Sequence, residues 1–157
     1  HRMPEAAPVF VEGTPGWSLH PALEDHLDPE TKRIHKQYAS VFAGTDTADW
    51  LHAKDIDTIT IVGYMTNNCD LGTAVEAEAL GFAAEILSDA SGAIHLANEA
   101  GQVSAQSLHE TLMILLHSNF AAVATTSAWV DAVDSGTSLP KSNLVVSAIQ
   151  GREAALS

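Results

Sequence analysis

An apolar segment followed directly by a helical one, Asp57–Leu80, constrains the fold of this chain more than any other stretch. Asp57–Gly63 is typical of a buried strand, because the residues after the aspartate are β-branched and uncharged up to the glycine. Turn-forming residues follow in Tyr64–Asn67, and Asn68–Leu80 then has helical spacing, with Gly81 placed to end the helix. The stretch therefore predicts a strand, a tight turn and a helix in direct succession.

The only cysteine of the chain, Cys69, falls in the first turn of this expected helix. There a thiol meets the positive end of the helix dipole and unpaired backbone N–H groups, which favour the thiolate form. A lone cysteine is also often a small buried hydrophobic residue, so both interpretations stay open on composition alone. The strand–turn–helix setting makes Cys69 a candidate nucleophile.

Further strands are predicted at Phe82–Leu87 and Ala121–Thr125, and they alternate with helical segments. Strands that are apolar on both faces and alternate with helices indicate a parallel sheet covered on both sides. The predicted fold class is therefore a three-layer α/β/α, Rossmann-like arrangement with a mostly parallel central sheet. Sites in such sheets lie at the carboxyl ends of the strands, where Cys69 and Asp89 are expected.

The longest predicted helix begins after Ser104, and its buried stripe is expected to consist of leucines: Leu108, Leu112, Leu115 and Leu116. His109 and His117 lie on the same helix without the spacing of a zinc-binding HExxH motif. We therefore expect both histidines to be exposed or satisfied by hydrogen bonds.

Shorter elements are expected from local patterns elsewhere in the chain. They are a helix near Pro21–His26, a mixed strand over Lys32–Lys36, a helix from Thr47 to about Lys54 capped by Thr45 or Asp46, a polar connection over Ser91–Gly101, and a strand or partner-packing tail over Leu144–Ile149. In the helix that begins at Thr47, Trp50 and Leu51 are expected on the inner face.

Composition narrows the classes of function. The 157 residues are 46% hydrophobic and 17% charged, which fits one domain over residues 1–157. No apolar run spans a bilayer, nothing resembles a signal peptide, and one cysteine cannot form an internal disulfide, so a cytoplasmic protein with no membrane partner is expected. A net charge of −13 repels phosphate backbones and argues against nucleic acid as a partner.

A series of short motifs then appears in a fixed order along the chain. The motifs are Gly13-Thr14-Pro15-Gly16 with His20-Pro21, Lys36-x-Tyr38-x-Ser40-x-Phe42 with Gly44-Thr45-Asp46, Ile56-Asp57-Thr58, Val62-Gly63-Tyr64-Met65-Thr66-x-x-Cys69, Thr73-Ala74, Gly81 and Asp89-Ala90. This ordered set resembles the isochorismatase-like cysteine hydrolases, a superfamily that includes nicotinamidases and N-carbamoylsarcosine amidases. The resemblance implies the same fold class and a hydrolase.

The resemblance also implies roles for individual residues. The family uses a Cys–Lys–Asp set, in which Cys69 matches the nucleophile and Lys36 matches the lysine. The backbone N–H groups of Met65 and Cys69 match the oxyanion hole, and the family carries a cis peptide bond at the position of Tyr64–Met65. Attack of the thiolate on a carbonyl carbon would expel ammonia or an amine and leave a thioester, which water hydrolyses.

The substrate pocket and the cofactor requirement are less directly indicated. Tyr64, Trp17 and Tyr38 are expected near the pocket, although Trp17 equally suits packing. Val9 falls where metal-dependent nicotinamidases have a histidine ligand, so no metal site and no other cofactor is expected. A small-molecule substrate and a homo-oligomer are the expected partners.

Two departures from the family pattern stand out. The family aspartate on its first strand has no counterpart here, and Asp25, Asp28 and Asp89 are not its equivalents. We therefore expect that an N-terminal strand and helix precede residue 1 of this sequence. Asp70 follows the cysteine where the family has an apolar residue, and a carboxylate there opposes thiolate formation unless it points away.

Three functions follow from these observations. The favoured one is hydrolysis of a C–N bond in a small amide or carbamoyl compound. The second is an isochorismate-type vinyl-ether hydrolysis, for which the cysteine is dispensable. The third is a non-catalytic relative that binds a small molecule or serves as a scaffold, which the missing aspartate and Asp70 motivate.

Overall fold

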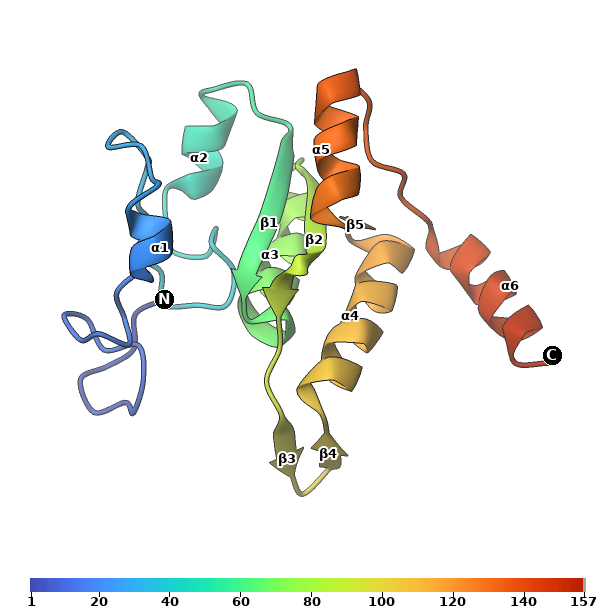
Figure 1. The fold of residues 1–157 in the computed structure, drawn as a ribbon, viewed down its shortest axis with the longest axis horizontal. Coiled ribbons are helices and arrows are strands. Elements are labelled where there is room, and N and C mark those ends of the chain that lie inside the picture. The colour runs from blue at the N-terminus through green and yellow to red at the C-terminus, as the bar shows by residue number, and fades with distance from the viewer. Residues whose placement is uncertain (157) are drawn as a thin grey trace.

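The computed structural model describes residues 1–156, and its centre is a parallel sheet of three strands in the order β1-β2-β5. The strands are β1 (Thr58–Tyr64), β2 (Ala83–Gly92) and β5 (Ala122–Ala124). Each strand pair is parallel, as the alternation of apolar strands with helices predicts. The predicted fold class is therefore confirmed (Figure 1).

Helices cover both faces of this sheet. The first face packs against α2 (Thr47–His52), α3 (Leu71–Ala79) and α4 (Ala105–Asn119), and it carries the main core: Phe42, Ala74, Ala77, Phe82, Ala84, Ile86, Met113, Leu116 and Ala121. The second face meets α5 (Thr126–Ser135), because Trp129 Nε1 donates to Glu85 Oε2 and Thr60 Oγ1, each at 3.1 Å. Thr60 and Glu85 are cross-strand partners, so this bond joins α5 to β1 and β2 together.

β1 differs from the strand that the sequence predicts, because it is not buried on both faces. Ile59 and Ile61 are half-buried against the core, but Val62 is 54% exposed and the threonines are exposed as well. The cause is position: within residues 1–156, β1 pairs with β2 alone, and its other edge has no ladder partner. An apolar pattern on both faces thus belongs here to an edge strand.

Two local predictions are wrong, and for a third segment the strand alternative is excluded. Residues 32–36 form no strand; Lys36 contributes one isolated backbone bond, in which its carbonyl oxygen accepts from Arg2 N at 2.7 Å. The expected polar connection after Ser91 contains a hairpin, β3 (Leu96–Asn98) and β4 (Gly101–Val103), because Asn98 and a glycine with φ of 138° supply a tight turn. The segment Leu144–Ile149 lies in a helix, α6 (Leu144–Ala154), which the Asn143 side chain caps.

Two predicted faces are rotated from their expected positions. In α4, Leu116 is buried and Leu112 packs on the core as predicted, but Leu115 is exposed and Met113 is buried in its place, because the buried stripe is turned slightly from the predicted one. In α2, Leu51 packs on the core as predicted, but Trp50 lies between the ammonium groups of Lys32 and Lys54, 5.3 and 5.4 Å from its ring. A tryptophan can be half-buried and also contact two lysine ammonium groups, because the face of its ring attracts cations.

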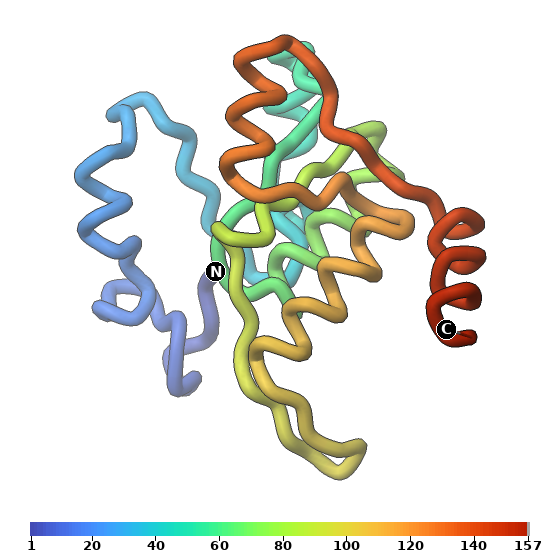
Figure 2. The backbone as a smooth tube through the Cα atoms, turned by 45° about the vertical axis from the view of Figure 1, so that its right-hand side comes forward, coloured from blue at the N-terminus to red at the C-terminus, as the bar shows by residue number. Residues whose placement is uncertain are grey.

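The two ends of the chain lie on opposite sides of the sheet. Figure 2 shows the N-terminal segment, with α1 (Pro21–Glu24), as a wide loop on one side and α6 on the other. An ion pair between Arg33 and Glu24 at 2.6 Å closes part of that loop. No helix among residues 1–156 is long and apolar enough to cross a membrane.

Candidate active site

The cysteine lies in a tight π-helical turn, Thr66–Asp70, between β1 and α3. Helical backbone therefore begins at Thr66, two residues before the predicted start at Asn68, and the Met65 carbonyl oxygen accepts bonds from Asn68 N at 3.0 Å and Asp70 N at 3.2 Å. The peptide bond between Tyr64 and Met65 is cis, at the position that the family resemblance implies. Cys69 is half-buried in this turn, at the carboxyl end of β1.

Lys36 reaches the cysteine from 33 residues away. Its Nζ lies 3.1 Å from Cys69 Sγ and also donates to the carbonyl oxygens of Tyr38 at 2.9 Å and Ala39 at 2.6 Å. The His1 Nδ1 atom lies 3.4 Å from the same nitrogen. Because two fixed carbonyls hold the ammonium in place, its remaining donor is directed at the thiol. The structure thus brings together the two side chains that the resemblance singles out.

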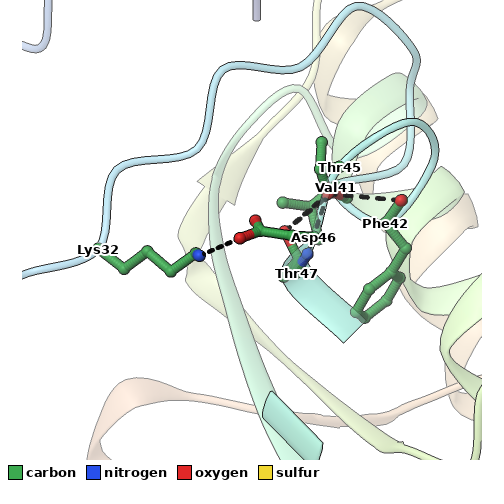
Figure 3. Close-up of polar contacts among 6 residues, drawn as sticks. All are labelled: Lys32, Val41, Phe42, Thr45, Asp46 and Thr47. Carbon is green, nitrogen blue, oxygen red and sulfur yellow. Dashed lines mark hydrogen bonds and ion pairs between the residues drawn. The ribbon is translucent and has the colours of Figure 1, made fainter. Parts of the chain in front are cut away.

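A braced loop holds this lysine beside the turn. The Thr45 and Thr47 hydroxyls both donate to the Val41 carbonyl oxygen, at 2.6 and 3.2 Å, and Lys32 pairs with Asp46 at 2.6 Å (Figure 3). The Val41 N–H in turn donates to Thr73 Oγ1 on α3 at 3.1 Å. These bonds connect the lysine loop to α2 on one side and to α3 on the other.

Gly72 allows the loop to approach α3, and the sequence reasoning missed it. A Cβ atom at this position would lie 2.9 Å from Ala39 Cβ and 3.1 Å from Ser40 N. Any larger residue would therefore push the lysine loop away from the helix that follows Cys69. A glycine one turn after a candidate nucleophile is the signal in the sequence, but its meaning depends on a neighbour more than 30 residues earlier.

A cleft of about 600 Å³ opens beside Cys69. Its lining combines the polar site residues with apolar side chains: Lys36, Tyr64, Met65, Cys69, Val9, Phe10, Val41, Leu51, Ile59, Ile61 and Val62. This size and mixture suit a small organic ligand. Trp17 and Tyr38 do not line it, because the Trp17 ring packs edge-on against His35 at 5.0 Å and Tyr38 is 61% exposed.

Asp70 turns inward from the cysteine turn. Its side chain is only 3% exposed, and its Oδ2 atom has no hydrogen-bond partner among the described residues. Burial raises the pKa of this carboxyl, and Ser91, His109 and Lys36 counter that rise in part. Asp70 lines the same cleft as Lys36 and Cys69, so it is burial, and not a position facing away from the cleft, that opposes its charge.

His109 contacts the cysteine turn, and the sequence does not predict this contact. Its Nε2 lies 2.9 Å from the Ser88 carbonyl oxygen and its Nδ1 lies 2.9 Å from Thr66 Oγ1. His117 Nδ1 accepts from Val123 N at 3.0 Å. Both histidines are satisfied, as predicted, but His109 in addition links α4 and β2 to the first residue of the cysteine turn.

The aspartates that the sequence excludes as equivalents of the family aspartate form no ion pair with Lys36. Asp89 Oδ1 accepts from Thr126 N at 2.7 Å and Thr126 Oγ1 at 2.8 Å, so it closes the start of α5, and these bonds lower its pKa. Asp28 closes a turn onto Glu30. Over residues 1–156, no carboxylate forms an ion pair with Lys36, and no group of three or more His, Cys, Asp or Glu side chains could hold a metal ion.

Comparison with known proteins places this geometry in context. A family model of the isochorismatase domain matches residues 2–128. Maleamate amidohydrolase of Pseudomonas putida is 37% identical over 57% of this chain and 42% of its own length, and the nicotinamidase/pyrazinamidase of Mycobacterium tuberculosis is 31% identical over 52% and 48%. The chain therefore spans less than half of each of these relatives.

Solved structures agree over more of the chain. A protein from Burkholderia xenovorans, described provisionally as an isochorismatase, superposes with a TM-score of 0.93 at 39% identity, over 99% of this chain and 74% of its own. A cysteine hydrolase from Pseudomonas syringae superposes with a TM-score of 0.74 at 26% identity, over 80% and 58%.

Proposed function

The chain belongs to the isochorismatase family of hydrolases, and from that premise we propose that it cleaves a C–N bond of a small amide or carbamoyl substrate through a thioester on Cys69. The observation that carries the proposal is the 3.1 Å contact between Lys36 Nζ and Cys69 Sγ beside an apolar cleft. The names of two relatives, an amidohydrolase and a nicotinamidase, favour an amide over a vinyl ether.

The proposed reaction assigns a role to each part of the turn. The Cys69 thiolate attacks the carbonyl carbon, and the backbone N–H groups of Met65 and Cys69 stabilise the negative charge on its oxygen. Lys36 stabilises the thiolate and passes a proton to the departing nitrogen. Ammonia or an amine leaves, and water then hydrolyses the thioester and releases the thiolate. Tyr64 borders the acyl group, since it lines the cleft next to the cysteine.

Lys36 needs a carboxylate to cycle its proton, and we propose that a further strand of the same hydrolase domain supplies it. The open edge of β1 supports this, because its N–H and C=O groups are available for another parallel strand. The apolar cleft runs beside that edge, past Ile59, Ile61 and Val62, to Lys36. A strand docked there would cover the exposed side of β1 and bring its end close to the lysine.

We also propose that a second copy of the chain packs on α6. No residue of α6 is buried, and Leu144, Val145, Ala148 and Ile149 share one face of the helix. This face points away from α4, because Ser147, Gln150 and Gly151 line the hollow between the two helices. It carries no acidic residue, so no carboxylates face each other across the contact, although each copy has a net charge of −13. The double substitution Val145→Glu and Ile149→Glu should halve the mass that light scattering measures. An unsubstituted chain that is monomeric would refute the proposal.

Release of ammonia tests the catalytic proposal. The protein is incubated with a panel of small amides, carbamoyl compounds and isochorismate. We expect release from at least one amide and its loss in Cys69→Ala, by about 10³-fold or more. Isochorismate cleavage that survives Cys69→Ala would support the vinyl-ether reaction instead. Cys69 that reacts with iodoacetamide no faster than a peptide thiol, together with no turnover, would favour a non-catalytic relative.

A further inference from the structure

We propose that Asp70 is a positioning residue that carries a proton in the folded protein and, in this neutral form, fixes the cysteine turn against β2 and α4. The inference deepens the proposed function and rests on it, because it concerns the turn that holds the candidate nucleophile. Nothing in the family resemblance assigns a role to this position, where the family has an apolar residue.

The surroundings of Asp70 do not suit a carboxylate. With 3% of its surface exposed, it is the single acidic or basic residue among the buried residues of the described chain. Its Oδ2 atom and the Oγ atom of Ser91 on β2 both lack a hydrogen-bond partner there. The Ser91 hydroxyl could donate to a carboxylate, but the charge would then stay buried without an ionic partner, which is costly. A protonated carboxyl can donate to the Ser91 oxygen and satisfy both atoms without burying a charge.

The cations near Asp70 are already engaged. Lys36 donates to two carbonyl oxygens and to Cys69 Sγ, so its three protons point elsewhere. His109, which faces Asp70 from α4, places Nε2 against the Ser88 carbonyl oxygen and therefore carries its proton there. In the neutral ring Nδ1 then accepts from the Thr66 hydroxyl. Neither group forms an ion pair with Asp70, and burial is the largest cause of its raised pKa.

The protonation of Asp70 matters to its neighbour in the sequence. An ionised Asp70 would place a negative charge beside the Cys69 thiolate and compete for the field of Lys36. A neutral Asp70 removes this opposition and leaves the lysine to the sulfur. It also joins β2 to a turn that Thr66 and His109 already join to α4. The two ends of the turn are then each held by a buried polar contact.

The test measures the alkylation of Cys69 by iodoacetamide as a function of pH in the full chain, in Asp70→Asn and in Glu78→Gln. Glu78 is exposed on α3, so its variant removes the same charge without burial. We expect Asp70→Asn to label with the same midpoint as the unsubstituted chain, because the asparagine side chain is neutral like the protonated carboxyl. Glu78→Gln should match the unsubstituted chain.

Infrared difference spectroscopy supplies a readout that does not depend on any variant folding. The unsubstituted chain should show the carbonyl band of a protonated carboxylic acid at neutral pH. Absence of that band, or a labelling midpoint lower by about half a pH unit or more in Asp70→Asn with a reactive cysteine in both, would overturn the inference and leave the proposed function standing. A cysteine that labels like a peptide thiol in both proteins would overturn both.

Discussion

Two junctions at the carboxyl edge of the sheet each place an aspartate near the start of a helix, and they treat it in opposite ways. At the start of α5, the exposed Asp89 accepts two hydrogen bonds from Thr126, which lower its pKa. At the cysteine turn, Asp70 is buried, one of its oxygens has no partner in the described chain, and burial raises its pKa. The first junction is satisfied by the fold alone, and the second keeps an unsatisfied acid beside the candidate nucleophile.

This difference separates a structural junction from a candidate site. Unsatisfied buried polar groups are rare in folded proteins, because each costs stability, and they gather where function requires them. The cysteine turn combines such a group with a lysine brought from a distant loop, whereas the α5 junction contains neither. Substitutions at the two junctions should therefore affect different properties: reactivity at the cysteine turn, and stability alone at the start of α5.

The largest effect is expected from Lys36→Met, which removes the cation from the cysteine turn. Turnover and the rate of Cys69 alkylation at neutral pH should fall by about 10²-fold, because the sulfur loses its charged partner at 3.1 Å. Lys54→Met is the matched control, since this lysine is exposed and lies over Trp50. Equal alkylation rates in both variants would mean that the contact has no chemical consequence.

The next largest effect is expected from Gly72→Ala, which places a methyl group where the lysine loop and α3 are in close contact. The new methyl group would meet Ala39 Cβ at 2.9 Å, so the free energy of unfolding in urea should fall by about 1–3 kcal/mol. Alkylation of Cys69 should slow as well, because the loop positions Lys36. Gly151→Ala in α6 meets no atom within 4 Å and should be neutral or stabilising by up to about 1 kcal/mol. A stable Gly72→Ala with normal reactivity would contradict the role of this close approach.

A pH-dependent gain in stability is expected for Asp70→Asn. Because the folded pKa of Asp70 is raised, the folded state holds its proton more tightly than the unfolded state, and stability falls as pH rises from the unfolded pKa through the folded one. The asparagine variant lacks this loss, so its advantage should be absent below about pH 4 and grow at higher pH. Each pH unit of difference between the two pKa values corresponds to about 1.4 kcal/mol. Urea unfolding at several pH values measures it, and a constant difference would refute it.

The smallest effect is expected from Asp89→Ala at the other junction, and its sign with pH is opposite. The folded pKa of Asp89 is lowered, so its contribution is present above the unfolded pKa and is lost as pH falls through the folded value. The melting temperature should therefore drop at neutral pH, and the difference should vanish in acid. Asp89→Asn keeps an oxygen for Thr126 and should lose less. A change in Cys69 alkylation would contradict the claim that Asp89 affects stability alone.

The sequence predicts the centre of the molecule well. The strand–turn–helix unit around Cys69 depends on contacts between neighbours in the chain, and such patterns are readable locally. The partnership of Lys36 with Cys69 joins residues 33 positions apart, and it was foreseen only through family resemblance. No periodicity or spacing would have paired them, because the loop that carries Lys36 has no regular structure.

What the sequence did not predict depends on tertiary neighbours. The exposure of β1 follows from its place at the edge of the sheet, and the burial of Asp70 follows from β2 and α4 closing over the turn. Gly72 acquires its role from Ala39, and His109 from Thr66. The first turn of α6 suggested a strand because it contains the β-branched residues Val145 and Val146, while the Asn143 cap and the helix formers that follow decide the outcome.

The contact between Lys36 and the single cysteine also makes the reaction rate of Cys69 sensitive to movement of the lysine loop. The lysine loop has to swing aside for the sulfur to lose its charged neighbour, and the loop is held by side-chain bonds rather than by a sheet ladder. Because the lysine contact speeds the reaction of the thiol, the alkylation rate falls as the loop spends more time away from the sulfur. Since the chain has no second cysteine, the labelling rate of the protein is that of Cys69 alone.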